Sequence, residues 1–219
     1  MCGLTGPRPR FSSTSSVLVG WRAVGRFFSS RRCCTVAPVR SEDAAGDRPD
    51  EVVPVPALLT LCTGNAARSV MAGAMLGPAP LRIVTAGTHV VEGQPMSRRT
   101  RDALASVGLQ AGGHRSHQLT DRDVEDAGLI LAMAGEHVHY IRRRHPEAAS
   151  RTVSIKRLCR VLPAGPAPLG ERLGVLGLAD VEIEPWEDVE DPAGGEDVVY
   201  LSCAKELADL CAGLLPRLG

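Results

Sequence analysis

The chain has 219 residues, enough for one domain with a modest core, and 44% of them are hydrophobic but only 3% aromatic. Its 25 basic and 25 acidic residues balance, yet residues 1–41 hold seven arginines and no acid, which leaves 18 basic against 25 acidic residues elsewhere. This excess of acid argues against a nucleic-acid partner for the main domain, and no apolar run is long enough to span a bilayer.

Residues 1–54 are predicted to be a disordered leader or an over-extended start, and residues 55–219 to form the domain. The arginine- and serine-rich start resembles a transit peptide, so a targeting role is the alternative. The seven cysteines match no disulfide scaffold and no zinc-binding spacing. We therefore expect a reducing, cytoplasmic setting and a monomer without metal or cofactor.

From residue 57 onward, predicted strands and helices alternate. The first half contains a strand at 57–62, a helix at 69–76, a strand at 81–85, a helix at 97–107 and a short helix from 120. The second half contains a strand at 129–133, a helix at 136–145, an edge strand at 151–158 and a long helix at 198–215. Residues 163–185, rich in Gly and Pro, show no clear pattern. Such alternation implies a parallel sheet covered by helices on both faces, with ligands bound at the carboxyl ends of its strands.

The segment joining the first strand to the first helix has the pattern of a phosphate-binding loop. It consists of Cys62, Thr63, Gly64, Asn65, Ala66, Ala67, Arg68 and Ser69. Its backbone N–H groups, the following helix N-terminus and the Arg68 fork can together surround a dianion. Three other cysteines have an arginine six positions later, but none lies between a predicted strand and helix. The alternative reading is a buried cysteine in an ordinary turn.

Hydrolysis of a phosphate ester needs a nucleophile, charge stabilisation and a proton for the leaving group. Cys62 and Arg68 supply the first two, and Ser69 is placed to donate a hydrogen bond to the sulfur unless it is an ordinary helix-start serine. Asp191, in the loop Asp191-Pro192-Ala193-Gly194-Gly195, is the candidate acid. On its own, such a dipeptide can mark only a turn.

From about residue 55 to 218 the chain resembles the low-molecular-weight protein tyrosine phosphatases. The landmarks that match in order are Cys62 to Ser69, Thr85 to Thr88, Gly108-Leu109, His114 to Ser116, Leu129 to Met133, and Asp191-Pro192 ahead of Tyr200. The resemblance implies a flavodoxin-like three-layer α/β sandwich with a four-stranded parallel sheet. It also implies a phosphocysteine intermediate on Cys62, Arg68 on the equatorial oxygens, and Asp191 as general acid and then base. Asn65 would hold the loop, His114 would support it, and His117 would be a surface residue.

Several positions depart from the family pattern. Ala193 follows Asp-Pro where an aromatic residue is usual, and residues 89–91 offer no aromatic ring, so we expect a weak preference for aryl esters. Ala66 stands where the related arginine phosphatases carry threonine, which argues against that specificity. Ala67 replaces the second loop cysteine, which would leave oxidised Cys62 without a nearby thiol.

The sequence therefore predicts a cysteine-dependent phosphate monoester hydrolase of the protein-tyrosine-phosphatase type, acting on a phosphorylated protein or a small phosphate ester. The alternative is a small-thiol-dependent arsenate reductase, because Trp186 with Asp191 to Gly194 resembles the loop of those enzymes. The thioredoxin-coupled type needs a cysteine where this chain has Ala134. A third hypothesis, an inactive phosphate-binding regulator, fits less well with an intact Cys62, Arg68 and Asp191.

Overall fold

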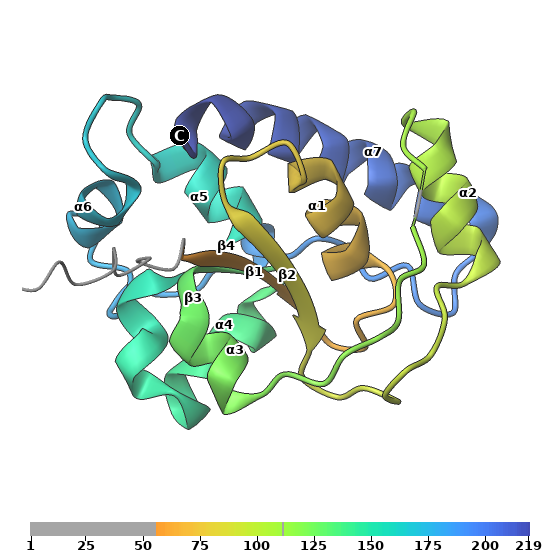
Figure 1. Cartoon of the computed structure of the whole chain (residues 1–219), viewed down its shortest axis with the longest axis horizontal. Coiled ribbons are helices and arrows are strands. Elements are labelled where there is room, and N and C mark those ends of the chain that lie inside the picture. The colour runs from red at the N-terminus through yellow and green to blue at the C-terminus, as the bar shows by residue number, and fades with distance from the viewer. Residues whose placement is uncertain (1–55, 111) are drawn as a thin grey trace, which may run out of the picture. The chain divides into compact units, whose positions relative to one another are not determined.

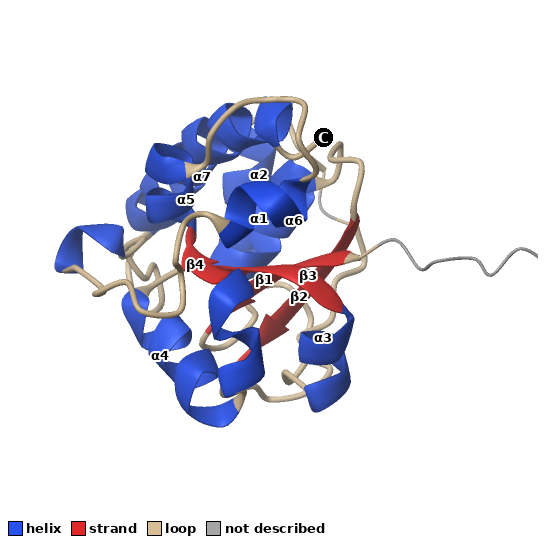
Figure 2. Cartoon of the chain, turned by 90° about the vertical axis from the view of Figure 1, so that its left-hand side faces the viewer, coloured by secondary structure: helices blue, strands red, loops and turns tan. Residues whose placement is uncertain are grey.

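The computed structural model describes residues 56–110 and 112–219, and the predicted leader at residues 1–54 lies outside this part. Four parallel strands form one sheet in the order β2-β1-β3-β4. They are β1 (Ala57–Cys62), β2 (Arg82–Gly87), β3 (Ala127–Ala132) and β4 (Thr152–Ser154). The edge-on view of Figure 2 shows helices on both faces of this sheet, which confirms the predicted three-layer α/β fold.

The helices divide between the two faces of the sheet (Figures 1 and 2). One face is covered by α1 (Arg68–Leu76), α2 (Arg98–Ser106), α5 (Ile155–Val161) and α7 (Asp197–Leu214), which supply most of the larger core. The other face carries α3 (Asp121–Asp126), α4 (Gly135–Arg144) and the 3₁₀ turn Pro146–Arg151. The remaining elements are α6 (Leu169–Gly174) and short 3₁₀ turns at Pro185–Glu187 and Leu215–Arg217.

The central strand β1 is buried on both of its faces. Leu58 and Cys62 join the core beneath α1 and α7, whereas Leu59 and Leu61 join the smaller core beneath α3 and α4. A parallel strand covered on both sides needs an apolar residue at nearly every position, as this one has. Because β2 and β3 pair with β1 on opposite sides, the carboxyl end of β1, and with it Cys62, lies where the strand order reverses.

Helix α7 runs along the larger core and is amphipathic, as its sequence predicts. It buries Cys203, Leu207, Cys211 and Leu214, so the two cysteines are core residues. Across the described part of the chain, no helix combines the length and apolar character needed to cross a membrane.

Two predictions at the level of secondary structure need correction. The predicted strand at 151–158 pairs with β3 only over Thr152–Ser154 and then turns into α5. Ser154 starts that helix by accepting a hydrogen bond from the backbone N–H of Arg157, and Ile155 and Leu158 then share one buried helix face. The unreadable segment 163–185 contains a short helix, α6, which contributes the buried Leu173.

Candidate active site

The loop between β1 and α1 wraps around the carboxyl end of the sheet. Cys62 is 3% exposed as the last residue of β1, and α1 begins at Arg68. Gly87, the last residue of β2, allows this loop to pack closely, because a Cβ atom there would lie 2.5 Å from the Thr63 carbonyl oxygen and 2.8 Å from the Asn65 nitrogen. Gly87 therefore makes room for the loop, a role that no sequence pattern indicates.

Asn65 organises the loop from the inside. It is fully buried with a left-handed backbone (φ 47°), a conformation that asparagine tolerates better than most residues. Its Oδ1 accepts from the His117 backbone N–H at 2.8 Å, while its Nδ2 donates to Ser69 Oγ at 2.9 Å and Thr85 Oγ1 at 3.0 Å. These hydrogen bonds agree with the role that the family resemblance implied for Asn65.

Ser69 lies beside the candidate nucleophile, with its Oγ 3.0 Å from Cys62 Sγ. Because the backbone N–H of His117 can only donate, it fixes the Asn65 amide with Nδ2 toward Ser69. The Ser69 oxygen therefore accepts from Asn65 and keeps its own hydrogen for the sulfur. This geometry supports the expected hydrogen bond from Ser69 to a Cys62 thiolate.

Arg68 and Asp191 lie in contact, although they are 123 positions apart in the chain. Arg68 is buried, and its Nη2 lies 2.6 Å from Asp191 Oδ2, while its Nη1 donates to the Val189 carbonyl at 3.3 Å. Asp191 is about half exposed and also accepts from the Ala193 backbone N–H at 3.1 Å. The candidate acid thus lies beside the phosphate loop, and its carboxylate forms an ion pair with Arg68, the arginine that is expected to bind phosphate.

One cavity of about 250 Å³ brings most of the predicted site residues together. Its lining consists of Cys62, Thr63, Gly64, Ala66, Ala67, Arg68, Asp191, Ala193 and Tyr200. Tyr200 is an aromatic residue in this lining, where the sequence led us to expect none. Trp186 is not involved, since it packs under the guanidinium groups of Arg157 and Arg160.

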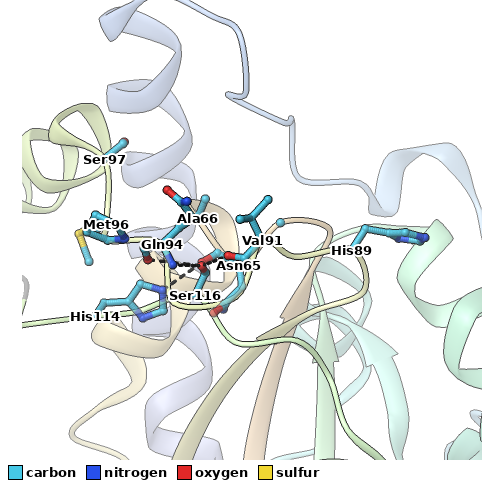
Figure 3. A pocket seen from close by; sticks show the side chains of 11 residues that line it. Asn65, Ala66, His89, Val91, Gln94, Met96, Ser97, His114 and Ser116 are labelled. Carbon is cyan, nitrogen blue, oxygen red and sulfur yellow. Dashed lines mark hydrogen bonds between the residues drawn. The ribbon is translucent and has the colours of Figure 1, made fainter.

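A second cavity of about 510 Å³ adjoins the first and shares Gly64 and Ala66 with it (Figure 3). The loop at 89–97 forms its outer wall, with Val91 strongly exposed. His114 lines this cavity, and its Nε2 lies 3.0 Å from the Asn65 carbonyl oxygen, the contact dashed in Figure 3. His114 therefore contacts the phosphate loop from the second cavity and does not line the cavity that contains Cys62.

His117 is more than the surface residue that we expected. Its backbone N–H holds Asn65, and its ring nitrogens contact Asp123 at 2.8 Å and Glu92 at 3.4 Å. Burial lowers the pKa of His117, but the hydrogen bonds and charges of Asp123 and Glu92 outweigh it, so the pKa is raised above its usual value. The ring thereby fastens the segment that supports Asn65.

The described residues contain no group of three or more His, Cys, Asp or Glu side chains that could hold a metal ion. Within the same part of the chain, Cys62, Cys159, Cys203 and Cys211 are free thiols. Burial raises the pKa of Cys203 and of Cys211 to about 12, and that of Cys159 to about 11, so these three have no tendency to act as thiolates. Cys62 is the cysteine that the fold places in a cleft.

Comparison with known proteins agrees with this site. Residues 57–164 match the family model described as low molecular weight phosphotyrosine protein phosphatase. A protein-arginine-phosphatase of Geobacillus stearothermophilus is 31% identical over 164 residues, which are 74% of this chain and 95% of that protein. A probable low molecular weight protein-tyrosine-phosphatase, EpsP, of Ralstonia solanacearum is 37% identical over 46% of this chain and 69% of its own length.

Solved structures show the same fold. The YwlE arginine phosphatase from Geobacillus stearothermophilus has 29% identity and a TM-score of 0.59, with 74% of this chain and 92% of that chain covered. The low molecular weight protein tyrosine phosphatase from T. tengcongensis has 28% identity and a TM-score of 0.59, with 74% and 99% covered. The chain therefore belongs to the low molecular weight phosphotyrosine protein phosphatase family and is a hydrolase of that family.

Proposed function

We propose that this protein is a metal-independent cysteine phosphatase that removes phosphate from phosphorylated protein side chains, with phosphotyrosine as its preferred substrate. The observation that carries the proposal is the convergence of Cys62, Arg68 and Asp191 on one cavity from segments more than 120 residues apart. The free state of all four described cysteines supports a reducing, cytoplasmic compartment.

In the proposed reaction, the Cys62 sulfur attacks phosphorus, an S–P bond forms, and the P–O bond to the leaving group breaks. Arg68 and the loop N–H groups stabilise the charge on the equatorial oxygens. Asp191 donates its proton to the departing oxygen and then, as a carboxylate, accepts a proton from the water that attacks phosphorus. That second step breaks the S–P bond, returns the thiolate to its contact with Ser69, and releases inorganic phosphate.

The surroundings of the catalytic cavity support an aromatic phosphate ester on a polypeptide. Tyr200 offers a ring beside Ala193, against which a phenyl group can pack. The adjoining cavity beyond Gly64 and Ala66 leaves room for the chain around a phosphorylated residue. Phosphoarginine is the second candidate, because the relative that this chain covers over 95% of its length is named an arginine phosphatase.

The reaction type is tested with p-nitrophenyl phosphate in the presence of EDTA. Wild-type protein should turn over, and Cys62→Ser should be inactive, with Cys203→Ser as the matched control that retains activity. Undiminished turnover by Cys62→Ser would falsify the mechanism. Arsenate with a small thiol donor is assayed beside it, and faster arsenate reduction than ester hydrolysis would favour the reductase. Phosphate binding without any turnover would favour the inactive regulator.

The substrate is tested with two peptides of equal sequence that carry phosphotyrosine or phosphoarginine. We expect a higher kcat/KM for phosphotyrosine. The variant Ala66→Thr, at an exposed position that lines both cavities, should shift the ratio toward phosphoarginine. A wild-type preference for phosphoarginine would assign this protein to the arginine-directed branch despite Ala66.

A further inference from the structure

A buried histidine in the first turn of α4 contacts the phosphate loop. His137 is only 1% exposed, and its Nε2 lies 3.0 Å from Oγ1 of Thr63, the residue that follows the nucleophile. Its other ring nitrogen, Nδ1, is buried and has no hydrogen-bond partner among the described residues. The reaction scheme above uses neither His137 nor the Thr63 hydroxyl.

The partners of the Thr63 hydroxyl define the state of the histidine. Glu136 Oε1 lies 3.0 Å from Thr63 Oγ1, and Arg68 Nη2 lies 3.4 Å from it. An arginine can only donate and a carboxylate only accepts, so the single hydroxyl hydrogen goes to Glu136 while its oxygen receives Arg68. The remaining lone pair is left for a hydrogen on Nε2 of His137, which Glu136 Oε1 shares at 3.2 Å.

This arrangement requires a neutral imidazole with its hydrogen on Nε2. A second hydrogen on Nδ1 would be buried without an acceptor, which is costly. Burial, and then the charge of Arg68, lowers the pKa of His137 to about 4, in agreement with the geometry. The histidine therefore acts as a fixed, uncharged donor toward Thr63 at neutral pH.

We propose that His137 is a positioning residue for phosphate binding, which acts through the Thr63 hydroxyl to orient the Arg68 guanidinium. Among the described residues, Nη2 of Arg68 has two side-chain hydrogen-bond partners, Asp191 at 2.6 Å and Thr63 at 3.4 Å. A bound dianion competes with the Asp191 carboxylate for this nitrogen, whereas the uncharged Thr63 hydroxyl does not repel the dianion. The Thr63 contact is thus the one that can persist while phosphate is bound, and the proposal rests on the proposed function of this loop.

The test measures binding of inorganic phosphate by isothermal titration, which needs no turnover. His137→Leu removes the donor, and Thr63→Val removes the hydroxyl with little change of shape. Each should weaken phosphate binding by about three- to tenfold, the range expected for a hydrogen bond. The double variant should lose no more than the weaker-binding single variant, because both changes break the same connection. Thr63→Ser, which keeps the hydroxyl, should bind phosphate nearly as the wild type does.

His145→Leu is the matched control, because His145 directly follows the other end of α4 and its Nδ1 lies 3.8 Å from carboxylate oxygens of Asp121 and Glu147, which are not part of the loop. It should leave phosphate binding unchanged. Should His137→Leu fail to fold, the comparison of Thr63→Val with Thr63→Ser still decides, since Thr63 is only half-buried. Additive losses, or a lower Tm with unchanged phosphate binding, would overturn the positioning role while leaving the proposed function intact. Phosphate binding that depends on His137 in a protein without phosphatase activity would support the positioning role and overturn only the proposed function.

Discussion

The two loops that meet at the cleft are built in different ways. The phosphate loop, residues 62–69, is held from inside, with Asn65 and Ser69 fully buried and joined by a short hydrogen bond. The acid loop, residues 188–195, is anchored where it begins, since Asp188 accepts from the Gly135 N–H at 2.7 Å. Its functional residue, Asp191, is about half exposed, and the side chain that holds it is Arg68.

The phosphate loop is therefore built for rigidity, whereas the acid loop leaves its carboxylate accessible to solvent. A dianion site needs convergent donors that do not reorganise, and buried hydrogen bonds provide them. A general acid must exchange protons with solvent and must leave its resting partner when phosphate arrives, which an exposed carboxylate can do. We therefore expect changes in the phosphate loop to affect both stability and rate, and changes in the acid loop to affect mainly rate.

The largest effect is expected from Asp191→Asn. Loss of a general acid typically costs ~10²–10⁴-fold in rate, so kcat for an alkyl phosphate should fall by that much. The loss should shrink for p-nitrophenyl phosphate, whose leaving group needs little protonation. Urea unfolding should change little, because the side chain is about half exposed. An equal loss for both esters would instead assign Asp191 a structural role in the turn.

Asn65→Gly should have the next largest effect and should lower both stability and rate. Glycine accepts the left-handed backbone, so the variant isolates the loss of the amide and its three hydrogen bonds. We expect the free energy of unfolding to fall by about 1.5–4.5 kcal/mol, at about 0.5–1.5 kcal/mol for each of the three bonds. Urea titration and kcat measured on the same samples check this. Gly64→Ala is the control for stability alone, since nothing lies within 4 Å of an added Cβ there but Gly64 lines the cavity.

A smaller effect is expected from Tyr200→Ala. Aromatic contacts contribute about 0.5–1.5 kcal/mol beyond area burial, so KM for a phosphotyrosine peptide should rise several-fold while KM for a small alkyl phosphate stays constant. Ala193→Tyr, which adds a second ring to the lining of the same cavity, should lower the peptide KM instead. If Tyr200→Ala changes both substrates equally, the ring supports the acid loop and does not contact substrate.

The smallest effect is expected from His117→Gln, and this effect on the free energy of unfolding should depend on pH. Because the pKa of His117 is raised in the folded protein, its stabilising contribution is fully present below the unfolded value of about 6.5 and is lost as pH rises through the folded value. The side chain is partly exposed, so the difference should be about 0.2–1 kcal/mol in acid and should vanish in alkali. Urea unfolding at several pH values tests this, with the exposed His139→Gln as control. A difference that grows with pH would contradict the assignment.

Much of the fold and the phosphate loop follow from the sequence, because they depend on residues that are close together in the chain. The phosphate loop occupies eight consecutive residues between a strand and a helix, so chain connectivity alone brings Cys62, Arg68 and Ser69 together. Alternating apolar segments likewise predict the parallel sheet. The edge strand was predicted too long, since Ser154 starts a helix there and an alternating pattern of few residues fits either structure.

Distant segments complete the site in a way that becomes visible in the folded protein alone. Folding brings Tyr200 to the cleft beside Ala193, places Gly87 where a Cβ would strike the loop, and sets His137 against Thr63. Gly87 and Tyr200 lie on landmarks of the family pattern and His137 on none, but no pattern indicates these contacts, because each joins residues far apart in the chain. The candidate nucleophile Cys62 and the loop around it follow from the sequence alone, because they are neighbours in the chain. The packing of α4, α7 and β2 around that loop sets the orientation of Arg68, the walls of the cleft and the position of Asp191, because these depend on contacts between distant segments.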